Sequence, residues 1–420
     1  MLDRNKLRNN LDFFKKKLVE RGVSESQFEA YVQADKAMRK LLHQIELANQ
    51  KQTLLAKQVA KKKGDLKLLK ESKELKQKLE QLNIAFKEAE TLSQELLLNL
   101  PNIADESVPV GRDETANLEL LKEGRKPVFD FTPLPHWELC ERLQLVAFDK
   151  ATKLTGARFV AYTDKAAKLL RAIASLMIDF NKNKYQEWNV PVIVNETSLT
   201  GTGQLPKFKD DVFKLENTRY YLSPTLEVQL ANLHANEIFT EGELPKYYTA
   251  TGVNFRQEAG SAGKQTKGTI RLHQFQKVEL VKFCKPSEAI HELEEMTRDA
   301  EQILLELKIP FRRLLLCSGD MGFSAQKTYD LEVWMAGCNE YREVSSCSSC
   351  GDFQARRAMI RYKDLTTGKN TYVATLNGTA LAIDRIFAAI LEHYQTKAGE
   401  VMIPQALLKY LDFDKITKPK

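Results

Sequence analysis

The sequence predicts an α+β protein, in which an N-terminal antiparallel two-helix coiled-coil arm precedes an antiparallel sheet flanked by helices. Three observations predict this fold class. Residues 26–100 contain almost no glycine or proline and repeat apolar residues every seven positions. After Pro101, short strand-like stretches lie between amphipathic helices. A chain of 420 residues is also too long for one ordinary core, so we expect domains over 1–105 and 106–420.

Two helices of about 35 residues, each roughly 50 Å long, account for most of the first domain. Their apolar residues form heptad series that would meet along one seam, with polar Gln52 interrupting the first series. Between the two series, Gly64 lets the chain reverse. The seam positions are Ala34, Met38, Leu41, Ile45, Ala48, Leu55 and Val59, then Leu68, Leu75, Leu79, Leu82, Phe86, Ala89 and Leu96.

The outer faces of the arm are basic. Between Lys36 and Glu88 there are 14 Lys or Arg and 6 Asp or Glu. This excess fits an ordinary solvated coiled-coil surface, and it also fits an arm that follows nucleic-acid phosphates; charge alone leaves both open. The candidates for phosphate contacts are Lys51, Lys57, Lys61, Lys62 and Lys63.

The second domain begins within 102–117, where Pro101, Pro109 and Gly111 interrupt regular structure. Proline cannot donate a ladder hydrogen bond, so Pro191 predicts an edge strand over 190–194. Amphipathic spacing predicts helices over 164–181 and 290–307. Further strands are expected over 248–258, 270–283, 330–345 and 371–377.

Composition narrows the class of protein. No run of 18 apolar residues is present and the start of the chain lacks the apolar stretch of a secretory signal, so we expect no membrane span and no export. Six cysteines in 420 residues do not form a disulfide framework, which favours a reducing, cytoplasmic setting. The net charge of +7 is a weak indication of a polyanionic partner.

Residues 254–283 are predicted to form a strand, a glycine-rich loop and a second strand. Alternation places Arg256 and Glu258 on one face of the first strand. One face of the second strand carries Arg271, His273, Phe275, Lys277 and Glu279. A guanidinium pairs with phosphate oxygens and an aromatic ring stacks on a base, so these two faces suit a nucleotide. From spacing alone, an exposed hairpin with a solvated charged face remains an alternative.

This stretch resembles motif 2 of the class II aminoacyl-tRNA synthetases in its seryl form. The resemblance rests on Phe255-Arg256-x-Glu258, the loop Ala259-Gly260-Ser261-Ala262-Gly263, and the series from Arg271 to Glu279. Other stretches resemble the seryl-tRNA synthetases in the same order, so the resemblance covers nearly the whole chain. They are 200–208 after motif 1, Pro224-Thr225-Leu226-Glu227, 341–348, 352–357, and 376–379 with Arg385 in motif 3.

The resemblance implies that ATP and Mg²⁺ activate L-serine to seryl adenylate, and that the seryl group then passes to the 3′-terminal ribose of tRNA(Ser). It leaves open whether tRNA(Sec) is also charged. It further implies that the arm grips the long variable arm of the tRNA, and that two copies of the chain form a homodimer through 164–194.

The resemblance also assigns roles to single residues. Arg256 and Arg385 would be catalytic. The implied ATP-binding residues are Arg256, Gln257, Glu258, Phe275, Glu343, Val344, Ser345, Ser346 and Arg385. The implied serine-binding residues are Thr225, Leu226, Glu227, Glu279 and Thr379. Glu343 and Ser346 would also bind Mg²⁺, which prefers oxygen ligands. Strict strand alternation, however, puts Ser345 rather than Ser346 on the face of Glu343.

Some positions depart from the family pattern or suggest another class. Asp384 stands before Arg385 where a small residue is usual, and it could weaken or reorient that arginine. Thr379 takes a place often filled by serine but keeps the hydroxyl. Cys347-x-x-Cys350 lacks a second ligand pair, so no zinc is expected.

Two other classes of protein fit these features less well. A non-catalytic relative should lose active-site residues, whereas Arg256, Glu258, Phe275 and Glu279 are all present. A ligase that loads a carrier protein would lack the long basic arm, which this chain has. Pyrophosphate exchange with serine, alanine, glycine and threonine would separate these classes.

Overall fold

The computed structural model describes residues 1–62, 64–259 and 267–418. The chain divides into two compact units, one of residues 2–101 and one of residues 102–420 together with Met1. The sequence placed this boundary four residues later, between 105 and 106.

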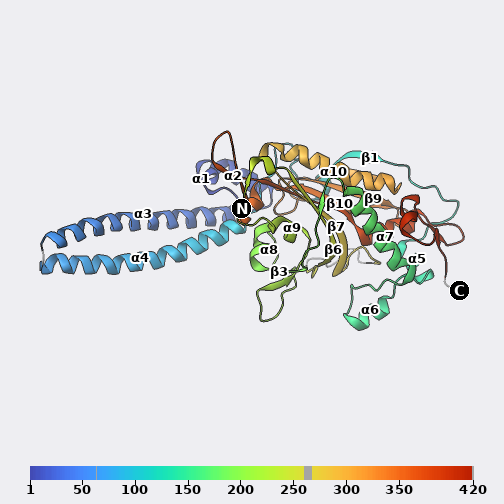
Figure 1. Cartoon of the computed structure of the whole chain (residues 1–420), viewed down its shortest axis with the longest axis horizontal. Coiled ribbons are helices and arrows are strands. Elements are labelled where there is room, and N and C mark those ends of the chain that lie inside the picture. Colours follow the sequence, from blue (N-terminus) through green and yellow to red (C-terminus); the bar gives the residue numbers. More distant parts are fainter. Residues whose placement is uncertain (63, 260–266, 419–420) are drawn as a thin grey trace. The chain divides into compact units, whose positions relative to one another are not determined.

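The first unit is helical, and the predicted two-helix coiled coil is confirmed. Its elements are α1 (Arg4–Asn9), α2 (Leu11–Glu20), α3 (Glu25–Lys61) and α4 (Leu66–Leu98). Figure 1 shows α3 and α4 side by side and antiparallel. The Ser24 and Gln27 side chains form a capping box that begins α3, and the Asp65 carboxylate accepts hydrogen bonds from the second and third backbone N–H groups of α4.

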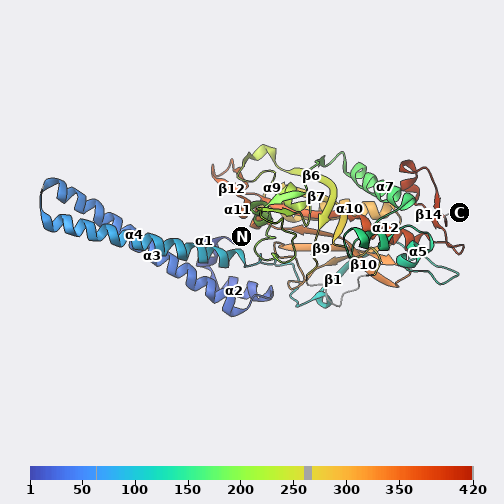
Figure 2. The same ribbon diagram turned by 90° about the horizontal axis from the view of Figure 1, so that it is seen from below.

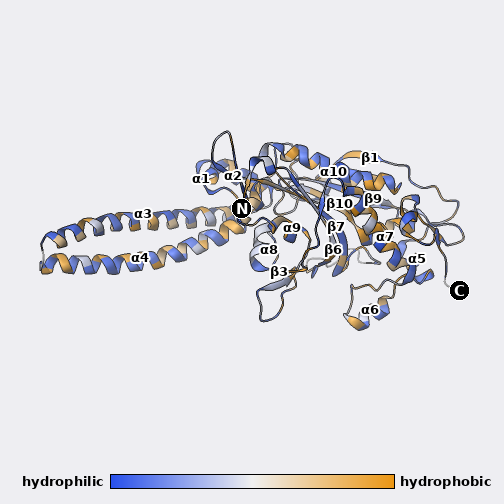
Figure 3. Ribbon diagram, in the orientation of Figure 1, coloured by the Kyte–Doolittle hydropathy of each residue, from blue (hydrophilic) through white to orange (hydrophobic). Residues whose placement is uncertain are grey.

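The predicted seam holds α3 and α4 together. Leu55 and Leu75 are among its buried residues, whereas Leu54, next in sequence to Leu55, is 61% exposed. Figure 3 shows both helices as mostly hydrophilic, with hydrophobic positions recurring along them. Burial of that narrow stripe is what orders two helices that otherwise face water. The buried cluster consists of Ile45, Ala48, Leu55, Leu75 and Leu79, with Leu68, Leu82 and Phe86 partly buried against it.

The second unit is built on an eight-stranded sheet with the strand order β1-β8-β9-β10-β13-β7-β6-β2. All neighbouring strands are antiparallel except β2 and β6, which are parallel. The strands are β1 (Leu118–Glu123), β2 (Gln186–Glu187), β6 (Lys246–Phe255), β7 (Gln274–Cys284), β8 (Phe311–Leu315), β9 (Lys327–Met335), β10 (Glu340–Ser349) and β13 (Ala374–Ala382).

The long helices α7 (Asp164–Asn181) and α10 (Ala289–Glu306) share one hydrophobic core with α12 (Ile383–His393) and the central strands. Figure 2 shows them beside the sheet. On β7, Val278 and Leu280 belong to this core. Because side chains alternate along a strand, Phe275, Lys277 and Glu279 lie on the other face of the sheet. The predicted helices over 164–181 and 290–307 and the predicted fold class are therefore confirmed.

The strand predictions needed several corrections. The edge strand predicted over 190–194 is shorter and starts later, as β3 (Ile193–Asn195), which pairs with β4 (Tyr220–Leu222) in a separate two-stranded sheet. The first motif 2 strand ends at Phe255, so Arg256 and Glu258 follow it rather than lie on it. The second begins at Gln274, so Arg271 and His273 precede it.

The predicted strands over 330–345 and 371–377 each prove to be parts of two strands. The first covers parts of β9 and β10, and the second covers parts of β12 (Asn370–Tyr372) and β13.

None of the described helices is long and apolar enough to cross a membrane. The remaining elements are α5 (His136–Arg142), α6 (Phe148–Leu154), α8 (Glu196–Thr202), α9 (Glu227–Asn232), α11 (Phe353–Ala358), β5 (Ile238–Thr240), β11 (Arg361–Lys363), β14 (Val401–Met402), β15 (Lys415–Ile416) and four short 3₁₀ turns, Glu114–Ala116, Glu241–Glu243, Pro286–Glu288 and Gln405–Tyr410.

Candidate active site

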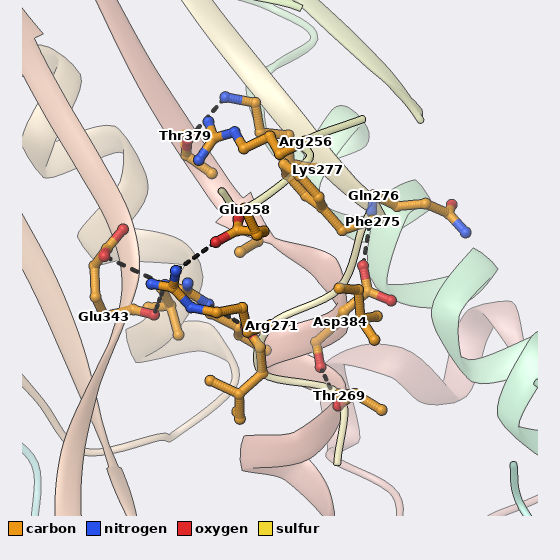
Figure 4. Close-up of a pocket in the computed structure, with 15 residues that line it drawn as sticks. Arg256, Glu258, Thr269, Arg271, Phe275, Gln276, Lys277, Glu343, Thr379 and Asp384 are labelled. Atoms are coloured by element: carbon orange, nitrogen blue, oxygen red, sulfur yellow. Dashed lines mark hydrogen bonds and ion pairs between the residues drawn. The ribbon is translucent and has the colours of Figure 1, made fainter. Parts of the chain in front are cut away.

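The open face of β7 lines a cavity that we call the inner cavity (Figure 4). The Arg256 guanidinium lies 5.2 Å from the centroid of the Phe275 ring. Arg271 forms an ion pair with Glu258. The backbone N–H of Arg256 donates to the His273 carbonyl at 2.9 Å, which keeps the two segments together beyond the ends of β6 and β7. The loop residues Gly260 to Gly263, quoted above for the resemblance, lie outside the described residues.

Asp384 does not capture Arg385. Its carboxylate accepts hydrogen bonds from the Tyr162 hydroxyl at 2.5 Å and from the Gln276 backbone N–H at 2.7 Å. Arg385 instead donates to the Glu343 carbonyl at 2.7 Å, and its Nη1 lies 3.3 Å from Oε2 of Glu343. Burial raises the pKa of the Asp384 carboxyl to about 6. Asp384 therefore joins the start of α12 to the start of β7, and Arg385 remains directed at the inner cavity.

A bulge in β10 resolves the conflict between Ser345 and Ser346. The register with β9 shifts between Glu343 and Ser345, so Glu343 pairs with Glu332 while Ser346 pairs with Asp330. Val344 and Ser345 are consecutive buried residues, and the Ser345 hydroxyl donates to the Thr379 carbonyl at 2.5 Å. The extra residue at the bulge thus brings Ser346 back to the face of Glu343.

Asp330 completes a group of oxygen donors with Glu343 and Ser346. Among the described residues, no group donates a hydrogen bond to its Oδ1 atom, although that atom is buried. Burial, with a smaller contribution from Glu343, raises the pKa of Asp330 well above its usual range. A buried, unpartnered carboxylate oxygen beside a second carboxylate and a hydroxyl is a donor set suited to a hard divalent cation. Asp330 could not be predicted, since nothing in the sequence marks it as different from other strand residues.

A second cavity of about 300 Å³, which we call the outer cavity, is lined by Glu227, Arg256 and Asn377 among others. Glu227 begins α9, and Gln354 Nε2 donates to its Oε1 at 2.6 Å. Burial raises the pKa of Glu227, and the hydrogen bond from Gln354 opposes that rise. Thr225 lies beside it, because its Oγ1 accepts from the Glu227 backbone N–H at 3.3 Å.

Glu279 and Thr379 are direct cross-strand partners on β7 and β13. Both lie on the open side of the sheet, and Glu279 is 1% exposed. Lys277 forms an ion pair with Glu279, and its Nζ lies 3.4 Å from the Thr379 hydroxyl oxygen. Sequence reasoning placed Lys277 on this face but gave it no role.

Arg256 joins the two cavities, because it lines both of them. The structure also brings Glu258, Phe275, Glu343 and Arg385 to the inner cavity, and Val344 and Thr379 line it too. Thr225, Glu279 and Ser346 line neither cavity but lie beside residues that do or that share their strand face, whereas Gln257, Leu226 and Ser345 are held by other contacts. Gln257 donates from its side chain to the Val212 carbonyl at 2.8 Å, Leu226 is buried in a hydrophobic cluster, and Ser345 is held by Thr379.

The cysteine pair is buried. Cys347 and Cys350 are 0% and 2% exposed, and burial raises the pKa of the Cys347 thiol to about 12, which disfavours the thiolate that metals bind. Among the described residues, one group of potential metal ligands lies together elsewhere: His136, Cys338 and Glu392. The Glu392 carboxylate there accepts hydrogen bonds from His136 Nδ1 and from the backbone of His136, Gly337 and Cys338. This group ties α12 to α5 through hydrogen bonds.

The sheet and the helices that flank it form the fold of a class II tRNA synthetase. Residues 208–394 match the tRNA synthetase class II core domain of the G, H, P, S and T enzymes. Residues 1–104 match the seryl-tRNA synthetase N-terminal domain. A serine–tRNA ligase of Mycoplasma pneumoniae is 99% identical over all 420 residues of both chains. Another from Mycoplasma genitalium is 79% identical over 99% of this chain and its own full length.

The solved structures agree with these matches. The crystal structure of seryl-tRNA synthetase from Pyrococcus horikoshii complexed with ATP has a TM-score of 0.94 to this chain, with 35% identity over the full length of both. The chain belongs to the seryl-tRNA synthetase family, and as a member it is an aminoacyl-tRNA ligase.

Proposed function

We propose that this chain activates L-serine with ATP and transfers the seryl group to the 3′-terminal ribose of tRNA(Ser). In the first step the serine carboxylate attacks the α-phosphorus, and pyrophosphate leaves. In the second step a ribose hydroxyl attacks the seryl carbonyl, its proton is released, and AMP leaves. The observation that carries this proposal is the position of Arg256 on both cavities, because one guanidinium can then hold the carboxylate and the α-phosphate together.

The inner cavity takes the nucleotide. Phe275 offers its ring to the adenine, and Glu258 offers a carboxylate to the adenine amino group. The Arg385 side chain lies beside Glu343 and is 25% exposed. Its guanidinium is therefore available to the phosphates. The ATP complex of the Pyrococcus horikoshii relative supports ATP as the nucleotide.

Mg²⁺ fits the oxygen donors of β9 and β10. Glu343 and Ser346 would hold the ion, with Asp330 beside them, because carboxylate and hydroxyl oxygens are the ligands that it prefers. When bound, Mg²⁺ supplies positive charge that offsets the charge developing on the phosphates. The bulge in β10 is what allows both residues to serve one ion.

Serine binds between the two cavities. Thr225 and Glu227 meet its ammonium group, and Glu279 and Thr379 meet its hydroxyl. Glu279 and Glu227 are 1% and 8% exposed, so a substrate that lacks the hydroxyl would leave a buried carboxylate poorly paired. That penalty favours serine over alanine.

The arm binds tRNA. Lys51, Lys57, Lys61 and Lys62 are exposed along α3 and at its end, and Lys51 also pairs with Glu71 at 2.9 Å. Lys63 lies outside the described residues. Exposed lysines attract phosphates at long range, and the match of 1–104 to a seryl-tRNA synthetase domain supports tRNA as the partner. We extend the proposal to a homodimer formed through 164–194, to the cytoplasm as its location, and to tRNA(Sec) as an acceptor to be tested beside tRNA(Ser).

The test is ATP–pyrophosphate exchange with serine, followed by charging of bulk tRNA with labelled serine. Arg256→Ala should lower both rates by about 10²–10³-fold, because a fixed positive charge at the reacting phosphorus is lost. Arg298→Ala is the matched control, since Arg298 is 54% exposed and pairs with Glu295 on the surface of α10. Exchange that does not depend on serine, or that survives in Arg256→Ala, would contradict the proposal.

A further inference from the structure

We propose that Lys277 is a specificity-determining residue: its ammonium keeps Glu279 ionised, so that the carboxylate accepts a hydrogen bond from the hydroxyl of the amino acid. This inference rests on the proposed function, because it concerns how the same site recognises serine. Lys277 is a positioning residue in this role, since it acts on the substrate through Glu279.

The geometry of β7 places Lys277 where it can do this. Phe275, Lys277 and Glu279 form a row on the open face, so Lys277 lies between the ring offered to adenine and the carboxylate offered to serine. Its side chain is 8% exposed and contacts the Glu279 carboxylate. Its Nζ also lies 3.4 Å from Thr379 Oγ1 (Figure 4). The ammonium therefore bridges both groups proposed to read the hydroxyl.

Glu279 is a carboxyl group whose charge depends on its neighbours. Among the described residues, neither of its oxygens accepts a well-directed hydrogen bond, so the ion pair with Lys277 is its main support. Burial raises the pKa of Glu279 to about 7, with Lys277 as the largest opposing influence. The other charged groups that face it are Glu227 from α9, which raises the pKa, and Arg256, which lowers it. The Cys347 thiol of β10 is also near, but burial keeps it protonated.

Loss of the lysine charge would therefore change recognition as well as stability. A neutral neighbour no longer favours the carboxylate, so the pKa of Glu279 rises and the acid form dominates at neutral pH. A protonated Glu279 offers fewer acceptor sites to the serine hydroxyl. Alanine has no hydroxyl, so the weak activity of the enzyme with alanine should not depend on the charge of Glu279. The ratio of serine to alanine activity is thus the quantity that Lys277 sets.

The experiment measures kcat/KM for serine and alanine in pyrophosphate exchange between pH 6 and pH 9 in the full-length protein. In wild type, kcat/KM for serine should rise with pH as Glu279 ionises, and we call this rise the acid limb. In Lys277→Met the acid limb should move to higher pH by about one to three units, since removal of an opposite charge at this range shifts a pKa by that amount. At pH 7, kcat/KM for serine should fall by about 5-fold or more, with alanine unchanged. Lys246→Met is the matched control, because Lys246 is a strand lysine paired with Glu243, and neither of them lines the two cavities.

A double variant keeps the test decisive if the single variant folds poorly. Lys277→Met with Glu279→Gln replaces the buried pair by neutral side chains of similar size, which removes the cost of an unpaired buried charge. We expect the acid limb to disappear in Glu279→Gln and in this double variant. Thermal unfolding, measured in parallel, shows whether each variant is folded.

Three results would overturn the inference. The first is an acid limb that stays in place in Lys277→Met while KM for ATP rises, which would make Lys277 a phosphate contact. The second is an equal loss of serine and alanine activity. The third is an acid limb that persists without Glu279, which would assign it to another group. Failure of the proposed function is a separate outcome, because the wild-type protein would then show no serine-dependent exchange.

Discussion

At the scale of single residues, Asp384 shows how one carboxyl in the wall of a cavity can organise the groups around it. It binds Tyr162 and the backbone of Gln276, while its own carbonyl accepts from the Thr269 hydroxyl at 3.2 Å. Gln276 follows Phe275, and Arg385 follows Asp384. The carboxyl therefore sets the spacing between the ring and the guanidinium that we assign to ATP.

Asp384→Ala should raise KM for ATP several-fold and leave KM for serine nearly unchanged. It leaves the Tyr162 hydroxyl and the Gln276 N–H without an acceptor, at a cost of about 1–3 kcal/mol for each buried group in the free energy of unfolding. Asp384→Asn should restore both values, because its amide can accept from Gln276 and donate to Tyr162. Steady-state kinetics with urea unfolding would check this. If Asn were as harmful as Ala, charge rather than hydrogen bonding would explain Asp384.

The sequence predicted which residues belong to the proposed site better than it predicted which groups they contact. The row on β7 and the site residue Arg256 could be expected, because strand periodicity and resemblance to motif 2 both point there. Lys277 and Gln354 stood in quoted motifs, yet Thr379 is brought to Lys277 by strand register, and Glu227 is brought to Gln354 by a helix distant in sequence. Such pairings depend on tertiary structure, which a single sequence does not specify.

At the scale of elements, the bulge in β10 and the early end of β6 mark the limits of periodicity. Strict alternation assumes that each residue of a strand lies opposite one residue of the neighbouring strand. A bulge breaks this alternation, because two residues of one strand then lie opposite one residue of its neighbour. Strict alternation therefore gave the wrong side for Ser346. Glu258, with a φ of 53°, lies in the left-handed region, so the chain has already left the strand there. The long helices were predicted well, because their repeats extend over many turns.

The seam between α3 and α4 can be tested with two adjacent leucines. Leu55 is 4% exposed and Leu54 is 61% exposed. Leu55→Ala should lower the stability of the arm by about 2–5 kcal/mol, whereas Leu54→Ala should change it by less than about 0.5 kcal/mol. Hydrogen exchange of the α3 and α4 amides would measure both effects. Equal protection in the two variants would mean that the seam does not order the arm.

At the scale of the whole molecule, the chain consists of two units with separate cores. The proposed adenylate site lies entirely in residues 102–420, and the basic helices lie in residues 2–101. If the units have separate roles, the two steps of the reaction should be separable by mutation.

Replacement of residues 30–95 by a short glycine–serine linker should abolish tRNA charging but preserve serine-dependent pyrophosphate exchange. The arm would be needed only for the step that involves tRNA. A full-length variant with Lys57→Glu, Lys61→Glu and Lys62→Glu should weaken charging in the same direction and make it less sensitive to salt, because fewer phosphate contacts release fewer counterions. Equal loss of exchange and charging in the linker variant would count against separate roles.

The order of strands in the sheet has a consequence for synthesis of the protein. β13 lies between β10 and β7, so residues 374–382 join the two halves of the sheet and bring Thr379 opposite Glu279. While β13 is still inside the ribosome, the complete arm has already been released, and its contacts are local and quick to form. Once β10 has also been released, β7 and β10 have facing edges without a partner until β13 follows. Nascent chains are therefore most prone to aggregate just before the active site closes, and that interval is when a chaperone would be needed.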